Sequence, residues 1–188
     1  MKISVFGASI LLATLAFAVA GCDSKSPPQG SSGAAAGTPK AAAAQLPPDL
    51  FVAQPPEGAV AVGKLKADAA APTSIVVYGR IGGRKEPFVA GSAMFLLADM
   101  SMKACSELEG DLCATPWDYC CEPKENLSKM LATVQVLGPD GKPLAVGLDG
   151  TNGLKPLAEL TITCDIASRE GGALVLTAKK IYVHPKRG

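Results

Sequence analysis

The chain has few aromatic residues, few charges and a single histidine. Aromatic residues make up 5% and charged residues 19% of the 188 residues, and 18 basic side chains nearly balance 17 acidic ones. A dedicated nucleic-acid binder usually carries a strong basic excess, so the near-neutral charge argues against nucleic acid as a partner.

Recognisable enzyme motifs are missing as well. The only histidine, His184, stands between Val183 and Pro185, where we expect an exposed tail, so no Ser/His/Asp triad has a usable base. The glycines of residues 79–83 are not followed by a helical pattern that would cradle a phosphate. Neither a C-x-x-C redox pair nor a C-x-x-C-H haem attachment occurs. We therefore expect a protein that is not an enzyme and carries no cofactor.

The first residues have the pattern of an export signal. Lys2 precedes an apolar run that ends in Val-Ala-Gly-Cys at residues 19–22. This ending resembles the lipobox of bacterial lipoproteins, a family in which the signal is cut before a cysteine that carries lipid. The resemblance implies a signal peptide over residues 1–21 and a lipid on Cys22 that holds the chain to the cell membrane, facing the periplasm or the exterior. An uncleaved membrane anchor is the alternative.

A segment poor in large apolar residues follows Cys22. Gly, Pro, Ser and Ala dominate it, and such a composition buries too little surface to offset the entropy lost on ordering. We expect a disordered linker over residues 22–49 and a transitional segment over residues 50–71 that lies along the domain without forming its core. The compact domain is expected over residues 72–188.

Five segments of this domain have the composition and alternation of β-strands. In the clearest, Leu160, Ile162 and Cys164 face one side and polar residues the other, which also marks Cys164 as a buried thiol. Turn-forming glycines, as in Gly82-Gly83, separate the segments. The predicted strands cover residues 74–80, 88–98, 131–137, 160–167 and 173–183.

Five short strands favour a closed barrel, because closure removes exposed strand edges. The pattern resembles the OB-fold in three stretches: V-V-Y-G-R-I-G-G at residues 76–83, F-V-A-G-S-A-M-F-L-L-A-D at 88–99 and K-K-I-Y-V at 179–183. We predict an all-β domain, a small five-stranded OB-like barrel, with a β-sandwich as the alternative. The resemblance also implies oligonucleotide or glycan binding as one alternative function.

A cysteine-rich loop at residues 100–129 separates the second and third predicted strands. It contains Cys105, Cys113, Cys120 and Cys121. Outside the cytoplasm, cysteines at short spacing are first interpreted as disulfides. A bond between the adjacent Cys120 and Cys121 would strain the intervening peptide. Two sets remain, Cys105–Cys120 with Cys113–Cys121 or Cys105–Cys121 with Cys113–Cys120, and we expect one of them to staple the loop.

A soft-metal or thiol-redox site is the alternative use of these four cysteines. Four thiolates bind zinc, and the thioethers of Met100 and Met102 suit Cu(I). The spacing C-x7-C-x6-C-C contains no C-x2-C knuckle, and adjacent cysteines seldom bind one ion. The acidic residues nearby, Asp118 among them, are expected to be solvated. Disulfides therefore remain the first expectation, and no metal site is assigned.

The same loop carries the aromatic residues Trp117 and Tyr119, which are typical interface anchors. The stretch P-W-D-Y-C-C at residues 116–121 resembles one that occurs in exported bacterial lipoproteins of uncharacterised function. We expect a lipid-anchored, non-enzymatic binding or structural module of the cell envelope that presents this loop to an envelope protein partner.

Overall fold

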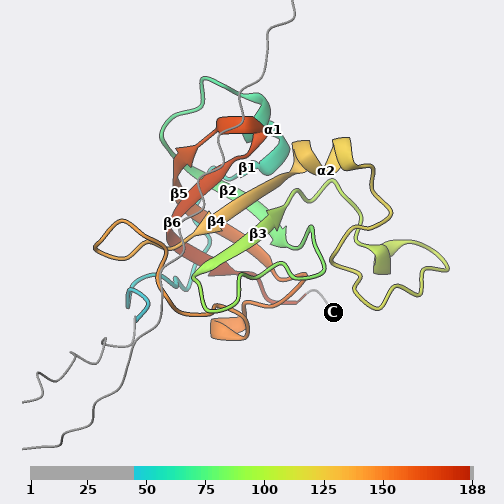
Figure 1. Cartoon of the computed structure of the whole chain (residues 1–188). Coiled ribbons are helices and arrows are strands. Elements are labelled where there is room, and N and C mark those ends of the chain that lie inside the picture. Colours follow the sequence, from blue (N-terminus) through green and yellow to red (C-terminus); the bar gives the residue numbers. More distant parts are fainter. Residues whose placement is uncertain (1–44, 187–188) are drawn as a thin grey trace, which may run out of the picture. The chain divides into compact units, whose positions relative to one another are not determined.

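The computed structural model describes residues 45–186. The predicted signal peptide, the lipid attachment at Cys22 and most of the predicted linker lie outside the described residues. Within the described residues, no helix has the length and apolar character needed to cross a membrane. Along the chain (Figure 1) the elements are β1 (Val60–Ala61), α1 (Val62–Ala67), β2 (Ser74–Ile81), β3 (Met94–Ala98), η1 (Cys105–Glu107), α2 (Lys124–Met130), β4 (Leu131–Gln135), η2 (Thr151–Gly153), β5 (Glu159–Ser168), η3 (Glu170–Gly172) and β6 (Val175–Val183).

Five of the strands close into a barrel. β2 pairs antiparallel with both β3 and β5, β3 pairs antiparallel with β4, and β6 joins β4 in parallel and β5 antiparallel. The short β1 adds a sixth strand, parallel to β2. The prediction of a small five-stranded, OB-like barrel is confirmed. A β-sandwich is not formed, because one continuous sheet closes on itself.

Alternating side chains of the strands fill the barrel. Leu160, Ile162 and Cys164 of β5 are all fully buried, as the period of two in this segment predicts. Phe95 of β3 and Ile181 of β6 belong to the same core. The Cys164 thiol donates to the carbonyl of Ile75 on the neighbouring strand at 3.6 Å, so it is a core group within the barrel.

Three predicted strands are shorter in the structure, and the one predicted over residues 131–137 ends at Gln135. The segment predicted to begin at Phe88 becomes a strand only at Met94, because the chain first turns at Gly91, which has a positive φ of 66°. Phe88 contributes only an isolated bridge to Phe95. The last strand begins at Val175, since η3 occupies residues 170–172.

The transitional segment, residues 50–71, is part of the core, which corrects the prediction that it lies along the domain. Leu50, Val62 and Leu65 are fully or almost fully buried in the main cluster. Val62 and Leu65 are three residues apart on α1 and therefore share one helix face. Leu50 is also tied to β6, because the amide of Ile181 donates to its carbonyl at 2.6 Å. Leu46, inside the predicted linker, packs against this core as well.

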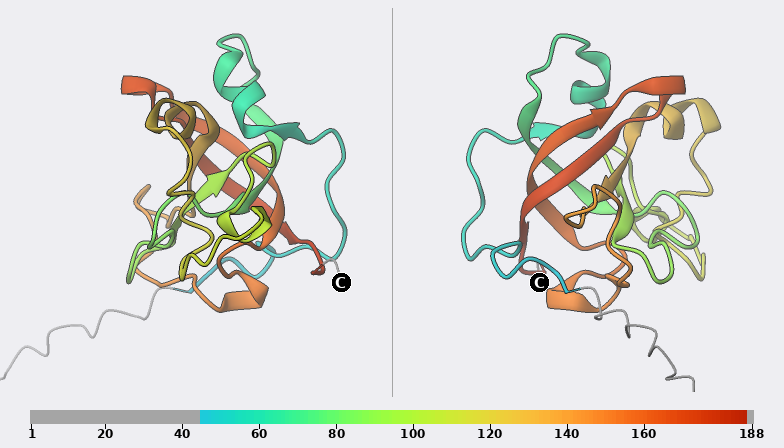
Figure 2. Two further views of the ribbon diagram at one scale, coloured as in Figure 1. Left: turned by 90° about the vertical axis from the view of Figure 1, so that its right-hand side faces the viewer. Right: turned by 60° about the vertical axis from the view of Figure 1, so that its left-hand side comes forward.

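Residues 99–123, called the 99–123 loop below, leave the barrel between β3 and α2. The loop extends to one side of the barrel, on the right of Figure 1, and Figure 2 shows the same excursion from two further directions. Its only helical element is the single turn η1. A small separate core of Ala98, Met102, Ala104 and Tyr119 lies beneath it. The 99–123 loop contains Cys105, Cys113, Cys120 and Cys121.

Candidate metal centre

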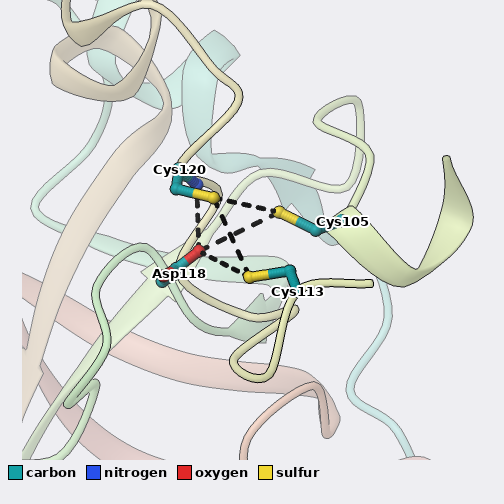
Figure 3. A group of neighbouring side chains, drawn as sticks. All are labelled: Cys105, Cys113, Asp118 and Cys120. Atoms are coloured by element: carbon teal, nitrogen blue, oxygen red, sulfur yellow. Dashed lines mark hydrogen bonds between the residues drawn. The ribbon is translucent and has the colours of Figure 1, made fainter. Parts of the chain in front are cut away.

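Four side chains of the 99–123 loop converge on one point (Figure 3). The Sγ of Cys120 lies 3.7 Å from that of Cys105 and 3.9 Å from that of Cys113. The Oδ1 of Asp118 lies 3.9 Å from the Cys105 sulfur and 4.0 Å from the Cys113 sulfur. All four ligand atoms are within 4.8 Å of one another, which makes them a candidate set of metal ligands.

These distances fit a tetrahedral ion. With zinc–sulfur bonds of about 2.3 Å, two sulfurs of a tetrahedral site are about 3.8 Å apart. A disulfide would instead place them at about 2.0 Å. All five cysteines within the described residues are free thiols, so neither predicted disulfide set is present at bonding distance. The Sγ atoms of Cys105, Cys113 and Cys120 nevertheless lie within 4.8 Å of one another.

Local hydrogen bonds orient the Asp118 carboxylate. The hydroxyl of Thr115 donates to Oδ2 at 2.9 Å, and the backbone amide of Cys120 donates to Oδ1 at 2.9 Å. Between them, Tyr119 has a positive φ of 55°, which turns the chain so that Cys120 comes back toward Asp118. Donors that hold a ligand in place are the usual second layer of a metal site.

The barrel fixes the position of η1 through an ion pair. Arg80 of β2 is buried, and its two terminal nitrogens donate to the two carboxylate oxygens of Glu107 at 2.8 Å each. The same guanidinium donates to the carbonyl of Met102 at 2.8 Å and lies 5.9 Å from the centre of the Tyr119 ring. Glu107 in turn accepts from the amide of Ala104 at 2.7 Å. Cys105, within this turn, is therefore anchored to β2.

The ion pair also shifts the pKa values of Arg80 and Glu107. Burial opposes the charge on Arg80, but the hydrogen bonds that Arg80 donates to Glu107, together with the nearby charge of Glu107, outweigh it and raise the pKa of Arg80. The hydrogen bond from Arg80 is the main cause that lowers the pKa of Glu107. Both side chains are thus charged at neutral pH.

Two members of the candidate site, Cys120 and Asp118, have shifted pKa values. Hydrogen bonding with the Cys105 thiol, then with Asp118, raises the pKa of Cys120. Burial acts to raise the pKa of Asp118, but the hydrogen bonds from Thr115 and from the Cys120 amide outweigh it, so this pKa is lowered. The carboxylate is therefore ionised beside the Cys120 thiol, whose raised pKa keeps it protonated at neutral pH. A divalent cation would reverse this balance, because metal binding displaces thiol protons.

Trp117 and Tyr119, the two expected partner-binding residues, lie in different environments. Trp117 is half-buried, and its indole nitrogen donates to the carbonyl of Lys85 at 2.9 Å. Tyr119 is 0% exposed, because it fills the small core beneath the loop, so its ring is not on the surface. Gly82 allows this close packing: a Cβ there would lie 2.7 Å from the Trp117 carbonyl oxygen and 2.8 Å from the Tyr119 ring.

Other residues also differ from the sequence-based expectations. Asp118, expected to be solvated, joins the sulfur group; its place three residues after Thr115 and two before Cys120 is the signal that could have identified it.

His184 is not in an exposed tail: its ring contacts Tyr182 edge-on at 4.8 Å and shares a hydrogen bond with Thr161 at 2.8 Å. Met102, considered as a copper ligand, is buried in the small core.

Comparison of the chain with protein-family models, with curated proteins and with solved structures gives no match.

Proposed function

We propose that the domain is a metal-binding module in which Cys105, Cys113, Asp118 and Cys120 hold a zinc ion. The observation that carries the proposal is the convergence of these four ligand atoms, whose hydrogen-bonded pairs are separated by 3.7–4.0 Å. The carboxylate favours zinc over Cu(I), because Cu(I) prefers soft sulfur ligands alone. Three sulfurs and one oxygen complete a tetrahedron.

The same distances argue against a simple disulfide in this place. The Cys120 sulfur is almost equally far from the Cys105 and Cys113 sulfurs, at 3.7 and 3.9 Å, whereas a disulfide joins it to only one of them. The Asp118 oxygen, 3.9 Å from the Cys105 sulfur, has no part in a disulfide. Metal coordination accounts for all four atoms together.

The role of such an ion is structural. Four protein ligands leave no open position for a substrate or for a reactive water, which distinguishes structural from catalytic zinc. The 99–123 loop has only the small core beneath it, so ligand bonds between η1 and residues 113–120 would supply the order that its own burial does not. The ion thereby holds Trp117 in place beside the turn that follows β2.

Presentation of this loop to a partner at the cell envelope is the wider part of the proposal. The lipobox pattern supports attachment through a lipid on Cys22 and a position outside the cytoplasm. A surface pocket of about 490 Å³, lined by Trp117, Phe88 and Val89 among others, supports a contact with an apolar group of an envelope protein. Val89 is 47% exposed, which leaves apolar surface next to the indole.

Metal analysis of the protein tests the proposal. The full chain, purified from bacterial membranes without added metal, is expected to contain zinc by elemental analysis and by native mass spectrometry. Cobalt exchanged into the site is expected to show the absorption of a tetrahedral cobalt–thiolate complex. Cys113→Ser removes a ligand and should abolish this spectrum.

The matched control is Cys164→Ser, which alters a cysteine in the barrel core, far along the chain from the loop. This variant should retain the metal of the parent chain. A metal-free native protein whose four loop cysteines are all oxidised to two disulfides would contradict the proposal. The mass of the intact chain, read in the same experiment, reports whether Cys22 carries lipid.

A further inference from the structure

A second group of potential ligands adjoins the first. The Oδ2 of Asp111 lies 3.6 Å from the Sγ of Cys121, and these atoms are within 4.8 Å of the Cys105 sulfur. Cys105 belongs to both groups and is only 1% exposed, whereas Cys121 is exposed. The loop thus offers two ligand sets that meet at one buried sulfur.

We infer that the loop holds two metal ions, bridged by the thiolate of Cys105. The first ion is bound by Cys105, Cys113, Asp118 and Cys120, and the second by Cys105, Asp111 and Cys121, with water in its fourth position. This inference rests on the proposed function and extends it, because it assigns a further site and the number of ions. A thiolate sulfur has lone pairs enough to bind two cations at once.

The adjacent pair Cys120–Cys121 is explained by two ions. Neighbouring residues seldom direct their side chains at one ion, and here the two have different partners: the Cys120 sulfur approaches Cys113, and the Cys121 sulfur approaches Asp111. One zinc would leave Cys121 beside the site without a role. Two zinc ions use both members of the pair.

The carboxylates of Asp111 and Asp118 are each held by a hydrogen bond from the backbone amide two residues later. Asp111 accepts the amide of Cys113 at 2.6 Å through Oδ1, and Asp118 accepts the amide of Cys120 at 2.9 Å in the same way. In each case the cysteine two residues later belongs to the first ligand set. The Oδ2 of Asp111 is thereby directed at Cys121, which is the partner required in the second set.

Charge favours a second cation as well. The four cysteines and two aspartates of the two groups carry six negative charges when all are deprotonated. One divalent ion neutralises two of these charges and a second neutralises two more, with the thiol protons released to solvent. Concentrated charge of one sign is costly in a partly buried site, so the negative charge that remains after the first ion has bound favours the second ion.

The two ions are expected to differ in lability. The first has four protein ligands. The second has three, of which Cys121 is exposed, so solvent and chelators reach it directly. The outer site therefore exchanges zinc with the medium while the inner site retains its ion.

Native mass spectrometry of the full chain in a volatile buffer containing zinc counts the ions directly. Two zinc ions per chain are expected, and a moderate chelator should remove one before the other. Cys121→Ser and Asp111→Asn should each leave one firmly held zinc, and Cys164→Ser should leave two. Exposed positions such as 121 tolerate this substitution without loss of the fold.

Cadmium-113 NMR tests the bridge itself. In the protein loaded with cadmium-113, two resonances are expected that couple to each other through the shared sulfur. Two resonances without coupling would overturn the bridge, and one ion per chain, unaffected by Cys121→Ser, would overturn the second site while leaving the proposed function intact. A chain that binds no zinc at all would refute the proposed function instead.

Discussion

The barrel and the 99–123 loop are held together in different ways. Hydrogen-bonded strands close around a single large core in the barrel. The loop has one helical turn, a core of four residues and a set of polar and sulfur contacts that converge from different segments. Burial of apolar surface therefore stabilises the barrel, whereas the loop is positioned mainly by hydrogen bonds and by the ion pair between Arg80 and Glu107. In the proposed function, the barrel is accordingly the support and the loop carries the metal site.

The largest effect is expected from the barrel core. Phe95 of β3 is fully buried, and Phe95→Ala should lower the free energy of unfolding by about 3–5 kcal/mol, because it removes a large side chain and leaves a cavity. Below the unfolding transition the cobalt spectrum of the loop should be unchanged. Denaturant unfolding and absorbance measure the two properties in one sample.

The control for this substitution is Leu112→Ala, because Leu112 is 97% exposed in the 99–123 loop. Its unfolding free energy should match that of the parent chain. Where Phe95→Ala proves too unstable to purify, Phe95→Leu keeps the test open with a smaller cavity. A cobalt spectrum of the folded Phe95→Ala variant that differs from that of the parent chain would contradict the independence of the two regions.

A smaller effect is expected from the ion pair that connects the two regions. Glu107→Gln replaces the charged partner of the buried Arg80 and should cost about 2 kcal/mol, because a buried guanidinium loses charge-assisted hydrogen bonds. Amide exchange should rise around η1 more than in the strands. Glu109→Gln, at a nearby exposed position, is the matched control. Equal behaviour of the two variants would show that the pair does not anchor the loop.

A smaller effect, on zinc affinity, is expected from a substitution of Thr115, which orients Asp118. Thr115→Val keeps the shape of the side chain but removes the hydroxyl that donates to Oδ2 at 2.9 Å. Loss of such a supporting hydrogen bond should weaken zinc affinity by about tenfold or more, with little change in barrel stability. Competition with a chromophoric chelator measures the affinity. An unchanged zinc affinity would show that the Asp118 carboxylate is not a ligand held by Thr115.

The smallest effect is expected from the thiol in the barrel core. Burial raises the pKa of Cys164 from its ordinary 9.0 to about 12. Because the folded-state pKa lies above the unfolded value, the stability linked to this group is complete below pH 9 and is lost as the pH rises toward 12. The loss is about 1.4 kcal/mol per pH unit within that interval.

Cys164→Ala removes this titration. The difference in unfolding free energy between the parent and the variant, measured at pH 8 and again at pH 10, should shrink by about 1 kcal/mol. A difference that is the same at both pH values would contradict burial of the thiol in its neutral form.

Sequence patterns predict the barrel well because each strand shows, in the alternation of its own apolar and polar residues, which side chains are buried. The alternation of Leu160, Ile162 and Cys164 identifies β5 without knowledge of its neighbours. The prediction is less accurate where the burial or the direction of a segment depends on contacts with residues distant in the sequence. Gly91 ends an apolar run that looks continuous, and Val62 and Leu65 become core residues only because the barrel end near α1 accepts them.

The candidate ligand set is only partly predictable from the sequence. Clustering of Cys105, Cys113 and Cys120 followed from their spacing, but the choice between disulfide and metal depends on distances that spacing does not contain. Asp118 resembles any surface carboxylate until Thr115 and the turn at Tyr119 direct it at the sulfurs. The anchor from Arg80 to Glu107 joins residues 27 positions apart, so no local pattern records it.

Hydrogen exchange of the full chain, compared with zinc bound and after chelation under reducing conditions, tests the central claim most directly. The account predicts that removal of zinc increases amide exchange throughout residues 99–123 while the five barrel strands keep their protection. Amide exchange in residues 99–123 that is the same with zinc bound and after chelation would contradict it.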